Sequence, residues 1–283
     1  MFTRTVSTLL VVLCAQPAFP QSILGNARTV LAAVVNAQGQ PVVDVGLDDF
    51  VVTEGGAPRE VIDVHVADYP LAIVIDDRPA LAPGLPAVRA AARRFIQRVG
   101  DRPIALLRLT DGRIPAATLD DDRATVLGQL DALVPGAEGG TGPLDTIATG
   151  ALLLRETGAP FSAVVVVAAG PVDASALVRG ERLPQIIESG AAVHVVQARP
   201  PDVDAGGGSI ADSDLLRVIA DQSRGQFTAI FSTASYGAAL DRLADRLAIE
   251  MMVQYLAPAG PRTGDVRVGV RMPGSRVVGL GVK

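Results

Sequence analysis

Apolar runs alternate with amphipathic segments from residue 69 to about residue 250. The runs have strand length and are rich in β-branched residues, which predicts strands at 69–75, 102–109, 162–170, 191–198 and 225–231. The segments between them carry apolar residues at helical spacing, which predicts helices at 85–99, 124–134, 143–157, 183–189, 213–223 and 235–251. This alternation predicts a doubly wound, mainly parallel α/β sheet. The run 113–119 is expected to add an antiparallel edge strand.

Both ends of the chain have a β pattern instead. Residues 28–67 contain short β-rich runs separated by turn sequences, and residues 251–283 return to strand-like runs separated by proline and glycine. Strands at either end need a partner sheet. We therefore expect the two ends to pair in one small β-sandwich, with the α/β domain of residues 69–250 inserted between them.

Residues 1–21 have the layout of a secretory signal peptide. A basic residue, Arg4, precedes an apolar stretch that is too short for a stable membrane anchor, and small or polar residues follow it. We expect export to a periplasm or to the cell exterior. The only cysteine, Cys14, lies inside this segment, so the mature chain would have no thiol and no disulfide.

Composition narrows the class of partner. Hydrophobic residues make up 49% of the chain but aromatic residues only 4%, so the core must consist of Val, Leu, Ile and Ala. The net charge is -5 and no basic stripe with interleaved aromatic residues occurs, which argues against a nucleic-acid partner. No stretch of the mature chain is apolar enough to predict a stable membrane span.

Candidate chemistry lies where the predicted parallel strands end, because ligands bind at that edge of open α/β sheets. Asp76 and Asp77 follow the run 69–75, and Thr141 lies in a glycine-rich loop. Carboxylates at a strand end often hold a metal ion. Arg78, a permanent cation, follows them directly and argues against one.

These motifs, in this order, resemble secreted bacterial proteins in which a von Willebrand factor A-type domain is bracketed by β segments. The resemblance covers residues 28–282, and the segments that carry it are VVNAQGQPVVDVGLDDFVVTEGGAPREVIDV, LAIVIDDRPAL, GGTGPLDTI, LLRVIADQSRGQF and LAIEMMVQYLAP. It implies a Rossmann-like α/β fold and a metal-ion-dependent adhesion site. In that site an Asp and two hydroxyls from the first loop, a Thr from the second and an Asp from the third hold a dication, which binds an acidic residue of a partner.

This chain matches the implied ligand set only in part. It has Asp76 and Thr141, but Arg78 and Ala80 stand where the hydroxyls are expected and Ala169 stands where the third-loop Asp is expected. At a separation of ~4 Å and an effective dielectric constant of 20, each pair of unit charges interacts by ~4 kcal/mol, so Arg78 would repel a dication. The resemblance therefore implies a degenerate metal site.

Three arrangements of this site remain open. In the first, Arg78 pairs with Asp76 or with Asp145 and takes the place of the metal ion. In the second, Asp76, Asp77 and Thr141 form a residual site that binds magnesium weakly. In the third, these three side chains are exposed and have no partner. No other cofactor is expected.

The sequence gives less support to a catalytic function. Adjacent residues of a strand point in opposite directions, so Asp76 and Asp77 are not expected to form a catalytic dyad. His194 lies in a predicted strand and is expected in the core, and His65 lies in the N-terminal β segment. Without a cysteine or a Gly-x-Ser-x-Gly elbow, no nucleophile is indicated. The acidic run 120–122 is expected to cap a helix.

The sequence thus predicts an exported, non-enzymatic protein-interaction module of the adhesion type with a decayed metal site. Its partner would be a protein whose identity the sequence does not give. The rim that would contact this partner contains Asp77, Arg78, Arg113 and Asp145. One alternative is a working magnesium-dependent adhesion domain that binds an acidic residue of a partner, and another is a hydrolase without a recognisable motif.

Overall fold

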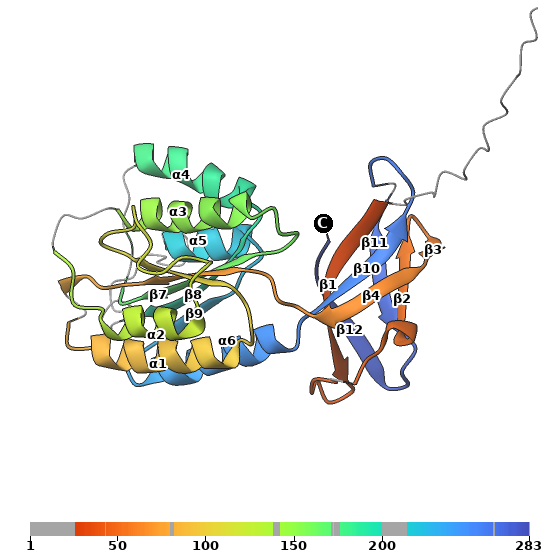
Figure 1. Cartoon of the computed structure of the whole chain (residues 1–283), viewed down its shortest axis with the longest axis horizontal. Coiled ribbons are helices and arrows are strands. Elements are labelled where there is room, and N and C mark those ends of the chain that lie inside the picture. The colour runs from red at the N-terminus through yellow and green to blue at the C-terminus, as the bar shows by residue number, and fades with distance from the viewer. Residues whose placement is uncertain are drawn as a thin grey trace, which may run out of the picture.

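The computed structural model has two parts that lie side by side, one of helices around a sheet and one made of strands (Figure 1). It describes residues 26–42, 44–79, 82–137, 142–170, 172, 176–199, 214–262 and 264–282. The predicted signal peptide, residues 1–21, lies outside the described residues.

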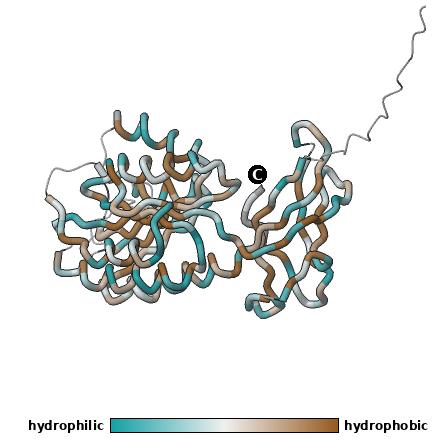
Figure 2. The backbone as a smooth tube through the Cα atoms, viewed as in Figure 1, coloured by the Kyte–Doolittle hydropathy of each residue, from teal (hydrophilic) through white to brown (hydrophobic). Residues whose placement is uncertain are grey.

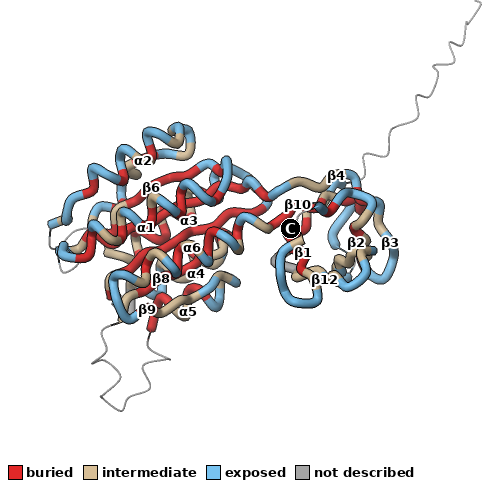
Figure 3. Tube along the Cα trace, turned by 90° about the horizontal axis from the view of Figure 1, so that it is seen from below, coloured by how far each residue is buried: buried red, intermediate tan, exposed pale blue. Residues whose placement is uncertain are grey.

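The first part contains a five-stranded parallel sheet with the strand order β6-β5-β7-β8-β9. Its strands are β5 (Leu71–Ile75), β6 (Ile104–Arg108), β7 (Ala163–Ala168), β8 (Ala192–Ala198) and β9 (Phe227–Ile230). Every residue of β5 and β7 is buried, which explains their continuous apolar runs, because both faces of such a sheet are covered. Figure 2 shows these strands as hydrophobic and Figure 3 as buried.

Helices cover both faces of this sheet. One face carries α1 (Leu85–Arg98), α2 (Arg123–Asp131) and α6 (Ser235–Ala248), and the other carries α3 (Pro143–Glu156), α4 (Ala176–Glu188) and α5 (Leu215–Gln222) (Figure 1). The side chains of β5 alternate between the two cores: Ile73 packs in the core with α1 and α6, and Val74 in the core with α3 and α5. The predicted doubly wound architecture is confirmed.

Two expectations about individual elements need correction. Residues 113–119 form no strand and touch the sheet through a single antiparallel bridge, Leu106 to Ala117. Pro115 has no N–H to donate to a ladder, which limits pairing along this segment. The helix expected at 183–189 is the second half of α4 and contains Pro184.

The second part is a β-sandwich built from both ends of the chain. One sheet has the order β12-β1-β10-β4 and the other β11-β2-β3. The strands are β1 (Asn26–Asn36), β2 (Phe50–Glu54), β3 (Ala57–Arg59), β4 (Val61–Val66), β10 (Met251–Ala257), β11 (Val266–Val270) and β12 (Ser275–Val282). A short helix, η1 (Leu47–Asp49), precedes β2. The N-terminal β1 pairs with the C-terminal strands β10 and β12, so the expected insertion of the α/β part into a β-sandwich is confirmed.

The two connections between the parts lie against each other. The backbone N–H of Ala67 donates to the carbonyl of Glu250 at 2.8 Å, and the Tyr69 hydroxyl donates to the Glu250 carboxylate at 2.5 Å. The Arg102 guanidinium stacks on the Tyr69 ring, 4.1 Å from its centroid. Burial raises the pKa of both Glu250 and Tyr69. Among the described residues, no helix is long and apolar enough to cross a membrane.

Candidate functional site

The end of β5 places two buried carboxylates at the carboxyl edge of the parallel sheet. Asp76 is 0% exposed and Asp77 1%. The backbone N–H of Asp76 still donates to the Val167 carbonyl at 2.9 Å, so the chain keeps its strand-like course there. The two carboxylates bind different partners, as expected for neighbouring residues of an extended chain, and they form no dyad.

The Asp76 carboxylate accepts hydrogen bonds on both oxygens. Oδ1 accepts from the Arg78 backbone N–H at 3.1 Å and from Arg78 Nε at 2.9 Å, and Oδ2 accepts from Arg78 Nη2 at 2.6 Å. The backbone N–H of Ala169, at the end of β7, donates to Oδ2 at 2.7 Å. This is the first of the two pairings expected for Arg78. The hydrogen bonds to Asp76 raise the pKa of the Arg78 guanidinium, which keeps it charged.

Asp77 ties together the loops that follow β5 and β6. Its carboxylate accepts from Arg108 Nε at 2.7 Å and from the backbone and hydroxyl of Thr110 at 2.9 and 2.8 Å. Its carbonyl accepts from the Gly136 N–H at 2.7 Å. A β-carbon on Gly136 would overlap the Thr110 hydroxyl, so only glycine fits this approach. Asp77 therefore lies beneath the rim and holds Arg108 at its surface.

The residues around Asp76 do not fit a divalent cation. Four N–H donors already use the lone pairs of its carboxylate, and two of them belong to the Arg78 guanidinium, a permanent cation. At the third-loop position Ala169 contributes a donor, whereas a metal needs an oxygen ligand. Among the described residues, no group of three or more His, Cys, Asp or Glu is arranged to hold a metal. Thr141 and Ala80 lie outside the described residues.

Tyr236, at the start of α6, binds the end of β7 at this edge of the sheet. It is 0% exposed, and its hydroxyl donates to the Ala168 carbonyl at 2.7 Å. Burial, and to a smaller extent the nearby Asp76, raises the pKa of Tyr236, so it stays a neutral donor. Sequence reasoning missed this residue because it lies in an ordinary amphipathic helix and belongs to no motif.

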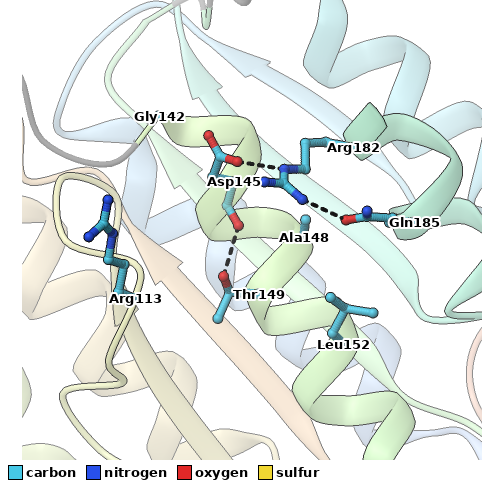
Figure 4. Close-up of a pocket in the computed structure, with 8 residues that line it drawn as sticks. All are labelled: Arg113, Gly142, Asp145, Ala148, Thr149, Leu152, Arg182 and Gln185. Carbon is cyan, nitrogen blue, oxygen red and sulfur yellow. Dashed lines mark hydrogen bonds and ion pairs between the residues drawn. The ribbon is translucent and has the colours of Figure 1, made fainter. Parts of the chain in front are cut away.

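Asp145, in the first turn of α3, pairs with a residue that the sequence did not single out. Arg182 of α4 donates from Nε to Asp145 Oδ1 at 2.6 Å and from Nη1 to Gln185 Oε1 at 3.1 Å. The alternative pairing of Arg78 with Asp145 is therefore not observed. Arg113, in the loop after β6, lines the same pocket as Asp145 (Figure 4). The pairing of α3 with α4 has no signal in the sequence.

His194 lies in the core, His65 in the β-sandwich, and the acidic run at the N-terminus of α2. His194 in β8 is 3% exposed, and burial lowers its pKa to about 3, so it is a neutral core residue as expected. His65 in β4 lies 2.7 Å from Asp63, in the β-sandwich. Asp122 caps α2 by accepting the Thr125 N–H at 2.7 Å, which lowers the pKa of its carboxyl and confirms the expected cap.

No protein-family model matches the chain, and no curated protein sequence does. Among solved structures, it is similar to proximal thread matrix protein 1 from the mussel byssus, with 16% identity and a TM-score of 0.48 over 66% of this chain and 49% of that one. BatB from Bacteroides thetaiotaomicron is 14% identical to this chain, with a TM-score of 0.46 over 64% of this chain and 98% of that one. The vWF domain of the pilus tip protein Mfa5 from Porphyromonas gingivalis is 13% identical, with a TM-score of 0.46 over 64% of this chain and 96% of that one. The chain spans about half the length of the mussel protein.

Proposed function

We propose that this chain is an exported protein-interaction module of the von Willebrand factor A type that binds its partner without a divalent cation. Residues 1–21 would direct export. Residues 69–250 would form the binding domain, mounted on a β-sandwich of residues 28–67 and 251–283. The observation that carries the proposal is the Arg78 guanidinium on both oxygens of Asp76, where the resemblance implies a metal ion.

The rim above the sheet would recognise its partner through fixed cations. Side chains of Arg78, Arg108 and Arg182 are 32%, 28% and 36% exposed, and each is held by an aspartate that is buried or partly buried. A cation fixed in this way loses little further freedom when it meets an acidic group. The rim would therefore replace the metal ion by arginines, and the partner would still present a carboxylate.

Affinity capture from the exported protein fraction of the source organism tests this function. The immobilised full chain should retain a specific protein, and the yield should be the same with and without a chelator. A chain with Arg78→Ala and Arg108→Ala should retain less of it. Loss of the partner on adding chelator would instead support magnesium-dependent adhesion, and turnover of a captured molecule would support a hydrolase.

A further inference from the structure

A polar pocket of about 390 Å³ forms part of the rim, between α3, α4 and the loop after β6 (Figure 4). Its polar lining comes from Arg113 on the loop, from Asp145 and Thr149 on α3, and from Arg182 and Gln185 on α4. Three separate elements thus direct polar side chains to one space. No motif in the sequence announces this pocket.

The charges of the pocket do not cancel. Arg182 and Asp145 form an ion pair, so together they carry no net charge. Arg113 is exposed and makes no hydrogen bond or ion pair within the described part of the chain. Arg182 uses Nε and Nη1 for Asp145 and Gln185, and Nη2 has no partner among the described residues. The pocket therefore has one uncompensated positive charge, on Arg113, and the Arg113 guanidinium and Arg182 Nη2 can donate hydrogen bonds to an anion.

The lining favours a singly charged carboxylate over other anions. A phosphate dianion would place two negative charges near Asp145, whereas one carboxylate balances the excess charge of Arg113. Arginine also presents planar donors that match a carboxylate. Ala148 and Leu152 of α3 also line the pocket, and they offer an apolar contact that a small inorganic anion would not use. These features fit a polypeptide better than a free ion.

We propose that this pocket binds an acidic side chain of the partner protein, held between Arg113 and Arg182. The inference rests on the proposed function and assigns the acidic group of the partner to one pocket of the rim. Asp145 and Gln185 orient Arg182, and Thr149 is fixed by its bond to the Asp145 carbonyl at 2.9 Å. The site lies apart from Asp76 and needs no metal ion.

Titration of the full chain, followed by NMR of the arginine Nε–H groups and the backbone amides, tests the pocket with a defined probe. The probe is N-acetyl-glutamic acid α-amide, and N-acetyl-glutamine α-amide is its neutral match. We expect saturable shifts at Arg113 and Arg182 with the acidic probe alone and a dissociation constant of about 1–10 mM. Arg113→Gln should weaken binding roughly fivefold or more, since it removes one charged contact.

Arg267→Gln is the control, because Arg267 is an exposed arginine of β11 in the β-sandwich, and it should leave the affinity unchanged. Arg113 makes no hydrogen bond or ion pair in the described part of the chain, so its loss should not disturb folding. The pocket assignment fails if no saturable shift appears up to about 50 mM, if both probes bind equally, or if inorganic phosphate binds more tightly than the acidic probe. A chelator-sensitive capture would overturn the proposed function instead, so the two failures are distinct.

Discussion

The Arg78 guanidinium lies across the Asp76 carboxylate, with Nε on one oxygen and Nη2 on the other. The two residues are separated by one position, and that position, Asp77, faces a different set of partners. A buried carboxylate needs a compensating charge, and here Arg78 supplies it from two residues further along the chain. This arrangement leaves a rim of fixed arginines.

Removal of this cation should destabilise the fold. Arg78→Ala leaves the buried Asp76 carboxylate with two backbone N–H donors, those of residues 78 and 169, and without its charged partner. We expect the free energy of unfolding to fall by roughly 2–3 kcal/mol, less than for a fully buried pair because Arg78 is partly exposed. Urea denaturation at neutral pH measures the loss. Arg93→Ala is the matched control, because the Arg93–Asp131 ion pair lies at the surface, with side chains 36% and 55% exposed. Equal losses in both variants would contradict the assignment.

A methyl group at Gly136 should disrupt the loops above the sheet. Its β-carbon would overlap the Thr110 hydroxyl and come within 2.9 Å of Asp77 Oδ2, so Gly136→Ala should cost roughly 1–3 kcal/mol of stability. Gly128→Ala in α2 has open space around the new carbon and should instead stabilise the protein by about 0.5–1 kcal/mol. Thermal denaturation compares the two variants. A gain in both would show that the loops do not pack as described.

The buried His194 should make the protein sensitive to acid. Burial lowers its pKa to about 3, whereas the unfolded chain takes up a proton near pH 6.5. Below that pH the unfolded state binds one more proton at this residue, so stability falls by up to about 1.4 kcal/mol per pH unit until the pH approaches 3. His194→Leu removes this contribution, and its stability should decline less steeply between pH 6 and pH 4. Parallel curves for the two proteins, from denaturation at each pH, would argue against a neutral buried imidazole.

The strands and helices of the α/β part could be predicted from the sequence because burial leaves a local pattern of apolar residues. Strands covered on both faces must be continuously apolar, as in β7, and surface helices must be amphipathic, as in α1, so both leave a local pattern. The same reasoning placed Asp76 and Asp77 at a strand end. The prediction of an edge strand at 113–119 was wrong, because the segment contains Pro115, which cannot donate to a strand ladder, and it pairs with the sheet only at Ala117.

The partners of the site residues were harder to predict. Arg182 reaches Asp145 only because α3 and α4 pack side by side, and Arg108 reaches Asp77 only because β6 pairs with β5. Such contacts depend on tertiary arrangement, and a single sequence has no periodicity that reports them. Arg78 and Asp76 are close in sequence, so their pairing was one of the two that the sequence offered, and the pairing with Asp145 was the other.

Calorimetric titration of the full chain with Mn²⁺ and Mg²⁺ at neutral pH tests the central claim most directly. With the Asp76 carboxylate occupied by Arg78, the protein should give no saturable heat of metal binding. A saturable uptake of either ion that disappears in Asp76→Asn would contradict the account, because it would mean that a dication displaces the guanidinium.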